Sequence, residues 1–196
     1  MLDWISKNVG GPSMVVFVGA LISAAGAYWG SRQRAHSDKD LAALISGGDS
    51  FCYMYIARNE PSPDGPLYGF TPVGEFPLYD VGVRIVDRDK VIEHPTTFEQ
   101  FVKGDTNLSL PTMAPGQNVL NGRWKMPDRK EVRYNIFFSA RNGYFTQVLR
   151  LRRVEGIWES ATRVRRGPYN DGPIIYEHVW PRYLRDPTEE IEWDEK

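Results

Sequence analysis

The chain has 196 residues, a length that suits one ordinary domain with appendages. Aromatic residues make up 13% of the chain, and its 18 glycines and 14 prolines suit short strands joined by turns better than a helical bundle. The formal net charge of -1 argues against a nucleic-acid-binding protein, and the single cysteine, Cys52, excludes an intramolecular disulfide.

The first element in chain order is an apolar segment at residues 13–30, which contains no charged side chain. A helix of this length reaches about 27 Å, close to the thickness of a bilayer's hydrocarbon core. Tyr28 and Trp29 close its far end, where aromatic side chains meet lipid headgroups. The segment therefore predicts a transmembrane helix at 13–30, preceded by an N-terminal tail at 1–12.

Two other interpretations of this segment stay open. Ala25-Gly26-Ala27 has the form of a signal-peptide cleavage site, which would make the β domain periplasmic or secreted. Against cleavage, Asp3 offsets Lys7 before the apolar run, and basic residues follow the run directly. A buried helix of a soluble protein would show a polar stripe, and this segment shows none.

The basic residues on either side of the span predict its orientation. Lys7 precedes it, whereas Arg32, Arg34 and Lys39 follow it. Because basic residues are retained in the cytoplasm, we expect the bulk of the chain to be cytoplasmic and to lie beside membrane lipid.

Small residues recur along the span on one helical face. Gly19, Ser23 and Ala27 are spaced four apart, and Gly26 with Gly30 forms a GxxxG pattern. Such spacing permits close approach of two helices and predicts a homodimer through the membrane segment, although glycine and alanine are common in any spanning helix.

Residues 31–48 predict a juxtamembrane helical stalk that ends at Gly47 and Gly48. From residue 49 to 166, runs rich in Val, Ile, Tyr and Phe alternate with turn clusters, which is typical of an antiparallel β domain. The run PLYDVGVRIVD, for example, alternates apolar and polar positions as a half-buried strand does.

Two turns predict the register of the last strands. Asn142-Gly143 suits a type I′ hairpin turn and would place Phe145 opposite Ala140, Leu149 opposite Ile136 and Arg133 opposite Arg152. Glu155-Gly156 would place Ile157 opposite Val154. Both hairpins predict the same inward face, consisting of Tyr134, Ile136, Phe138, Ala140, Phe145, Leu149, Leu151, Trp158 and Val164. The expected fold is an immunoglobulin-like antiparallel β-sandwich of seven to nine strands behind one N-terminal transmembrane helix.

The anchor, the GGDSFCYMYIA start, the PLYDVGVRIVD strand, the APG turn and the YNIFFSARNGYFTQVLRLRR hairpin together resemble a group of small bacterial single-pass membrane proteins with a C-terminal β domain. The resemblance covers most of the chain and implies a bacterial inner-membrane location. It brings no assigned activity, cofactor or catalytic residue.

The outward face of the same hairpins predicts a ligand- or partner-binding surface. Residues 129–166 contain ten Lys or Arg against three Glu, and the outward positions include Arg133, Phe137, Arg150, Arg152 and Arg163. This face fits a plain solvated surface, a surface for lipid headgroups or a protein partner, or a site for a phosphorylated ligand.

Residues 167–196 predict an aromatic extension packed across the sandwich and an acidic C-terminal tail. We expect the last ten residues to be mobile, with their carboxylates attracted to the basic face.

Candidate catalytic residues are few. His94 and His178 are isolated in sequence, and Asp87, Asp89 and Asp128 lack the spacing of a calcium loop. We therefore expect no catalytic residue, no metal and no cofactor. The sequence favours a membrane-anchored, non-catalytic module that binds an unknown protein partner. The alternative is an effector that senses an anionic, phosphorylated ligand.

Overall fold

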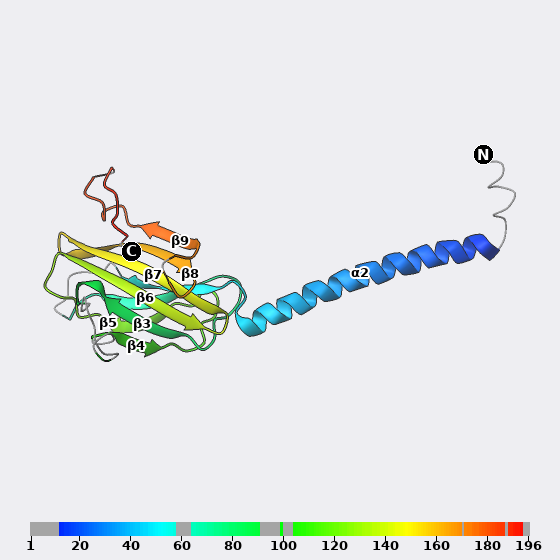
Figure 1. Cartoon of the computed structure of the whole chain (residues 1–196), viewed down its shortest axis with the longest axis horizontal. Helices are drawn as coiled ribbons and strands as arrows, with labels where there is room; N and C mark the ends of the chain where they lie inside the picture. The colour runs from blue at the N-terminus through cyan, green and yellow to red at the C-terminus, as the bar shows by residue number, and fades with distance from the viewer. Residues whose placement is uncertain are drawn as a thin grey trace. The chain divides into compact units, whose positions relative to one another are not determined.

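The computed structural model describes residues 12–57, 64–90, 99, 104–169, 171–186 and 188–193, and it leaves undescribed the side chains of residues 12–22, Gln33 and His36. The chain divides into two compact units, Met1–Ile45 and Ser46–Lys196 (Figure 1). His94, one of the two histidines considered above, lies outside the described residues.

The first unit contains one continuous helix, α2 (Pro12–Ser46), of 35 residues. Pro12 occupies the first position, where a missing amide donor costs nothing, and the helix ends before Gly47 and Gly48, both of which have positive φ. Among the residues whose side chains are described, no helical stretch is long and apolar enough to cross a membrane. The first ten residues of the predicted span lie outside that set, so the anchor stays a prediction.

The predicted helix-association face lies on α2. Ser23, Gly26 and Ala27 are exposed, and Gly30 is half-buried. A methyl group added at Gly26 or Gly30 would meet no other atom within 4 Å. The side-chain surroundings of position 19 are outside the described set.

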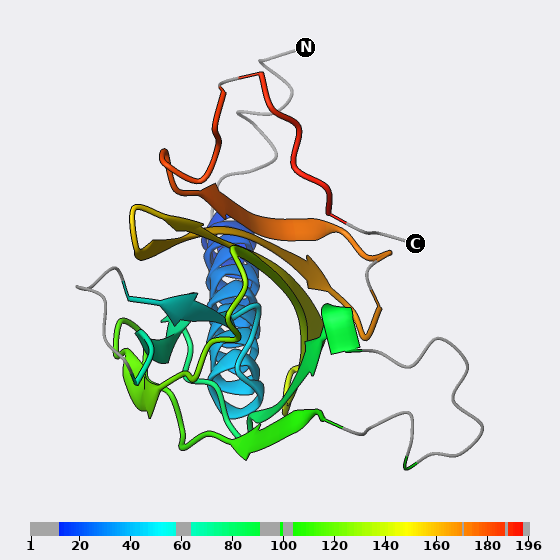
Figure 2. The same ribbon diagram turned by 90° about the vertical axis from the view of Figure 1, so that its left-hand side faces the viewer.

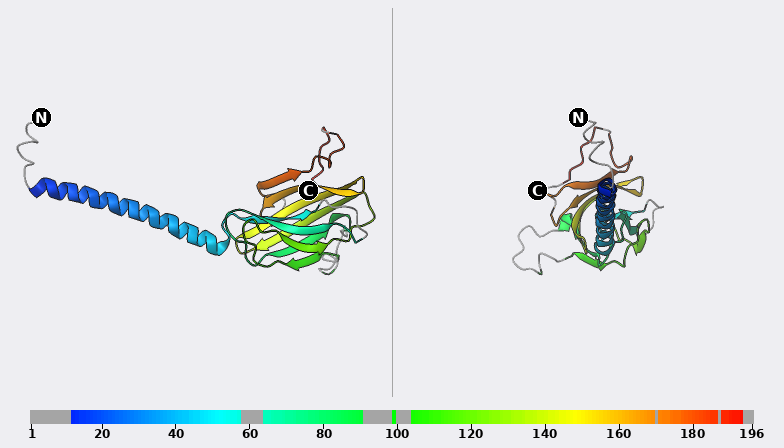
Figure 3. Two further views of the ribbon diagram at one scale, coloured as in Figure 1. Left: turned by 180° about the vertical axis from the view of Figure 1, so that it is seen from behind. Right: turned by 90° about the vertical axis from the view of Figure 1, so that its right-hand side faces the viewer.

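The second unit consists of two antiparallel sheets. The smaller sheet has the order β1 (Phe51–Ile56), β2 (Leu67–Val73), β5 (Val119–Arg123). The larger sheet has the order β4 (Thr106–Ser109), β3 (Gly82–Asp87), β6 (Glu131–Ala140), β7 (Gly143–Val154), β8 (Ile157–Arg166), β9 (Ile174–Val179), and a 3₁₀ turn, η1 (Arg88–Lys90), follows β3. The larger sheet curves around the smaller one (Figures 2 and 3). These nine strands, counted over the described residues, confirm the predicted all-β domain.

The core lies between the two sheets. Phe70 of β2 meets Phe138 of β6 edge to face, with ring centroids 6.2 Å apart, and Phe138 stacks on Phe145 of β7 at 4.8 Å. Of the nine residues predicted to face inward, all are buried except Ala140, which is half-buried and packs against the core. The alternation of apolar residues therefore predicted the inner face correctly, because a one-residue slip would expose all of them.

The register of the second hairpin is confirmed. Val154 pairs with Ile157, and Arg152 pairs with Glu159. Glu155 and Gly156 have φ of 51° and 85°, the positive values that both central residues of a type I′ turn require.

The predicted register of the first hairpin is wrong by two residues. Phe145 pairs with Phe138, and Leu149 pairs with Tyr134, so that Arg133 lies opposite Arg150 rather than Arg152. Ala140 pairs with Gly143, which has positive φ, whereas Asn142 does not. The physical reason is that the Asn142 amide donates hydrogen bonds to the carbonyls of Gly48 and Ser50, at 3.0 and 2.6 Å.

The segment predicted as an extension contributes a sixth strand to the larger sheet. β9 pairs with β8 from Ala161 opposite Val179 to Arg165 opposite Ile174, with one irregularity at Val164–Arg165. Residues 188–193 lie over the outward face of this sheet, where they contact its arginines, and their mobility stays a prediction.

Candidate binding site

The basic face is the outward surface of β6, β7 and β8 that carries Arg133, Arg150, Arg152 and Arg163. Strand alternation places all four side chains on this side of the sheet, as predicted. Three of them lie under the C-terminal tail, which we define as residues 184–193.

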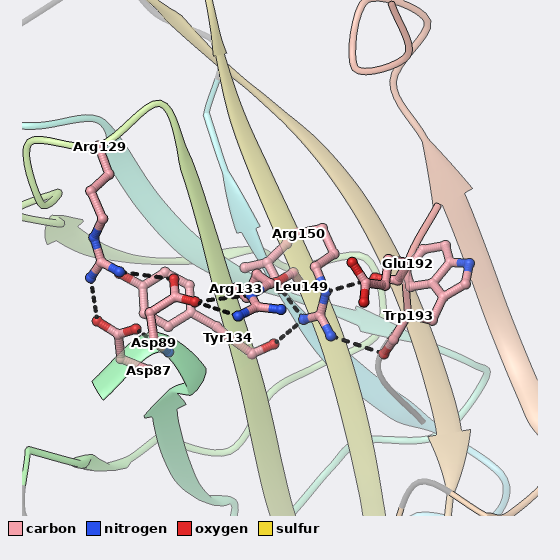
Figure 4. A network of polar contacts seen from close by, with 9 residues as sticks. All are labelled: Asp87, Asp89, Arg129, Arg133, Tyr134, Leu149, Arg150, Glu192 and Trp193. Atoms are coloured by element: carbon pink, nitrogen blue, oxygen red, sulfur yellow. Dashed lines mark hydrogen bonds and ion pairs between the residues drawn. The ribbon is translucent and has the colours of Figure 1, made fainter. Parts of the chain in front are cut away.

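Arg150 is buried, with 2% of its surface exposed, at the centre of the basic face. Its guanidinium donates to the carbonyl oxygens of Tyr134 and Leu149 within the sheet, each at 3.2 Å. It also donates to the carbonyls of Glu192 at 3.2 Å and Trp193 at 2.9 Å (Figure 4). Main-chain carbonyls of the tail therefore solvate a buried cation, which would be costly to bury without partners.

Arg152 binds the tail through a carboxylate. Its two terminal nitrogens meet the two carboxylate oxygens of Glu189 at 3.0 and 2.8 Å, and its Nε meets Glu131 at 3.0 Å. The hydrogen bond to Glu189 raises the pKa of Arg152. The same bond, with one from the Arg185 amide, lowers the pKa of Glu189 to about 2. This paired geometry holds the tail by charge-assisted bonds.

The other two arginines of the basic face have partners of their own. Arg163 bonds to Glu177 of β9 at 2.7 Å, and its guanidinium lies 4.3 Å from the centre of the Trp193 ring. Arg133 meets Asp89 at 2.8 Å. Carboxylates and an aromatic ring of the chain itself therefore occupy the positions that a ligand bound to this face would take.

Phe137, the fifth predicted binding residue, lies apart from this cluster in its contacts. The Arg84 guanidinium of β3 sits 5.7 Å from its ring centre. With Gly82 and Tyr144 it lines a shallow depression of about 280 Å3. The structure therefore brings together Arg150, Arg152 and Arg163, and it directs Arg133 and Phe137 to other neighbours.

Asp87 and Asp89, which the sequence analysis weighed as calcium ligands, instead bind basic side chains. Arg129 bridges them at 3.4 and 3.0 Å (Figure 4), and Lys90 meets Asp87 at 3.3 Å. Across the described residues, no three His, Cys, Asp or Glu side chains are arranged to hold a metal ion.

A second site, which the sequence analysis did not predict, is a groove of about 410 Å3 beside the edge of β1. One wall is β1, with Tyr53 and Tyr55, and the opposite wall is β9, with Tyr176 and His178. Its remaining described lining consists of Met54, Ile56, Ala57, Thr71, Asn118, Leu149, Ser160, Thr162 and Trp180. This volume lies within the range of about 300–1,000 Å3 that is usual for ligand pockets.

Aromatic contacts fix the two walls of the groove. Tyr53 and Tyr176 stack with ring centres 4.7 Å apart and planes 17° apart, and the Tyr176 hydroxyl donates to the Tyr53 hydroxyl at 3.3 Å. His178 and Trp180 meet edge to face at 5.1 Å. Burial, together with the hydrogen bond to Tyr53, raises the pKa of Tyr176.

Strand alternation explains why these residues gather. His178 pairs with Thr162 and Tyr176 with Val164, which places both on the inward side of β9, whereas Glu177 points outward to Arg163. Glu177 and His178 are adjacent in sequence, but the fold turns their side chains to opposite sides of β9, so that His178 lines the groove with the tyrosines. The sequence does carry a signal for this site, because ring-bearing residues alternate in FCYMYI and in IIYEHV. Alternation within each strand could not show that Tyr53 and Tyr176 would meet.

Comparisons with known proteins found no relative of this chain. No protein-family model matches the chain, no curated protein matches it, and no solved structure matches it.

Proposed function

We propose that this chain is a membrane-anchored, non-catalytic binding module that presents its β-sandwich beside the bilayer and takes its ligand in the groove between β1 and β9. The groove carries the proposal. Aromatic surfaces and hydrogen-bonding side chains from both sheets converge on this open space, whereas the basic face is covered by the chain's own tail.

The apolar segment 13–30 supports the anchor. It contains no charged residue and forms part of one uninterrupted helix that starts at Pro12. The proposed location is the bacterial inner membrane with the β domain in the cytoplasm, and the small residues of the span support a homodimer. The immunoglobulin-like type is part of this proposal and is supported by two antiparallel sheets that enclose one core.

The anchor is tested by placing charges in the span of the full-length chain. Val16→Arg with Leu21→Arg costs about 2.5–3.5 kcal/mol per charge at the centre of a membrane helix, so we expect the chain to leave the membrane fraction. Leu41→Arg with Leu44→Arg, in the exposed last turns of α2, is the matched control and leaves fractionation unchanged.

Intact mass measurement of the membrane-bound protein separates the anchor from its rival. The anchored form keeps residues 1–27, whereas a mature chain that starts after Ala27 would establish the cleaved signal peptide and the periplasmic or secreted alternative. Retention of the Val16→Arg, Leu21→Arg variant in the membrane fraction would also contradict the anchor.

A second candidate function is a sensor of an anionic ligand on the basic face. The bidentate pairing of the Arg152 guanidinium with the Glu189 carboxylate favours this function, because a phosphate group would bind the guanidinium through the same two nitrogens. Such a ligand must displace the tail. Calorimetric titration with inorganic phosphate and with nucleotides tests it, and Glu189→Gln is expected to strengthen binding. Absence of binding to both proteins removes this candidate.

A further inference from the structure

The groove has a chemical character that its surroundings do not share. None of its 13 described lining residues is Asp, Glu, Lys or Arg, although these types make up 25% of the chain and would supply about three of 13 positions at that frequency. Arg163 and Glu177, close by on the outward side of β8 and β9, pair with each other across the sheet face. The charges of these strands are thus directed away from the groove.

A charged ligand would lose its hydration in this groove without gaining an opposite charge among the described residues. Burying such a group without a partner is costly, whereas an uncharged polar group needs only hydrogen bonds. The groove offers those bonds: the hydroxyls of Ser160 and Thr162 lie on its β8 side, and the imidazole of His178 and the amide of Asn118 line it too. Its lining therefore discriminates by charge as well as by shape.

The aromatic walls add a preference for a flat, ring-shaped partner. Tyr53 and Tyr176 stack on each other, so each ring has one face already covered, and Trp180 stands perpendicular to His178. Aromatic faces attract the polarised C–H groups of a sugar ring while hydroxyl and amide groups bond to its rim.

Building on the proposed function, we propose that the groove binds an uncharged saccharide, whose ring packs on Tyr176 and Trp180 and whose hydroxyls bond to the Ser160, Thr162 and His178 side of the groove. The proposal goes beyond binding in general, because it names the ligand class and excludes the anionic ligand that the basic face predicts.

The test uses the full-length chain in a detergent whose headgroup is not a sugar, so that the detergent cannot compete. Glucose, maltose and cellotriose serve as neutral probes in calorimetric titrations. Glucose 6-phosphate, glucuronate and glucosamine serve as charged counterparts with the same ring. We expect saturable binding of at least one neutral probe, and binding at least about tenfold weaker for its charged counterparts.

Variants locate the binding. Trp180→Ala and His178→Ala are each expected to weaken binding of the neutral probe at least about tenfold, because each removes a ring that lines the groove. Tyr144→Ala, which removes an exposed aromatic ring elsewhere on the larger sheet, is the matched control and leaves affinity unchanged. Thermal unfolding of each variant confirms that its fold is intact, and Tyr176→Phe gives a milder change should Trp180→Ala unfold.

The outcomes separate this inference from the proposed function. Charged counterparts that bind as well as or better than the neutral probes, with loss in Trp180→Ala, would overturn the saccharide assignment and leave the groove as the binding site. No binding of any probe would overturn the saccharide assignment alone, whereas binding that Trp180→Ala and His178→Ala leave unchanged would overturn both the assignment and the groove as the binding site.

Discussion

At the scale of single residues, Gln147 joins the two sheets. Its side chain is fully buried, and its amide oxygen accepts from the Met54 amide at 2.7 Å while its nitrogen donates to the Met54 carbonyl at 2.8 Å. It thus pairs with the edge of β1 as a neighbouring strand would. The same nitrogen also donates to the Thr162 hydroxyl at 2.5 Å.

We expect Gln147→Leu to lower the free energy of unfolding by about 2–5 kcal/mol, because it leaves two buried main-chain groups of Met54 without partners. Thr162→Val removes only the side-chain bond and should cost about 1 kcal/mol. Urea unfolding of the full chain, followed by tryptophan fluorescence, measures both. Equal costs for the two variants would show that the Met54 contacts contribute nothing.

At the scale of elements, the two hairpins show which parts of the fold could be predicted from sequence. The Glu155-Gly156 turn is determined locally, since both residues adopt the positive φ that the turn needs. At Asn142-Gly143 the local preference is overridden, because Asn142 bonds to the main chain of Gly48 and Ser50, more than 90 positions away. Pairs that form only after folding leave no trace in the local pattern.

The candidate sites follow the same division. Strand alternation placed the arginines of the basic face correctly, since it depends only on neighbours in sequence. Alternation could not show that the carbonyls of Glu192 and Trp193 would bind Arg150. This contact forms only when the tail, more than 40 positions later in the chain, folds back onto the sheet. The groove was missed for the same reason, since Tyr53 and Tyr176 lie 123 positions apart.

The attachment of the C-terminal tail should depend on acidity. The pKa of Glu189 falls from its ordinary 4.5 to about 2 because of Arg152, so Glu189 holds its charge in this range only when the tail is attached. The contribution of Glu189 is therefore complete above pH 4.5 and is lost as pH falls through about 2. Hydrogen exchange of residues 188–193, corrected for intrinsic rates, should rise in this window.

Substitution should reproduce this effect at neutral pH. Glu189→Gln removes the charge that pairs with Arg152, and we expect several-fold faster exchange of residues 188–193 at pH 7. Glu190→Gln changes the tail's net charge equally at an exposed position and serves as the control. Equal exchange in the two variants would contradict a specific role for Glu189.

At the scale of the whole molecule, the proposed anchor raises a question that can be measured, namely on which side of the membrane the β domain would lie. Cys52 is unsuitable as a probe, because its side chain is fully buried and burial raises the pKa of its thiol. A chain with Cys52→Ala and Glu75→Cys carries one thiol at an exposed position instead. We expect a membrane-impermeant maleimide to label it only after lysis.

Labelling of Glu75→Cys on intact cells would place the domain outside the cytoplasm and overturn the orientation inferred from Lys7, Arg32, Arg34 and Lys39. The Cys52→Ala chain without the new thiol gives the background, and urea-unfolded wild type shows that Cys52 itself reacts once exposed.

The amide of Gln147 also affects how copies of this protein behave when they are crowded together. Exposed strand edges can pair with strands of neighbouring molecules, and in the proposed anchored form confinement to a membrane would raise the local concentration of the chain. Because the Gln147 side chain already occupies the outer hydrogen-bonding groups of Met54, we expect β1 to offer an incoming strand no continuous row of free groups and to resist pairing with a second copy.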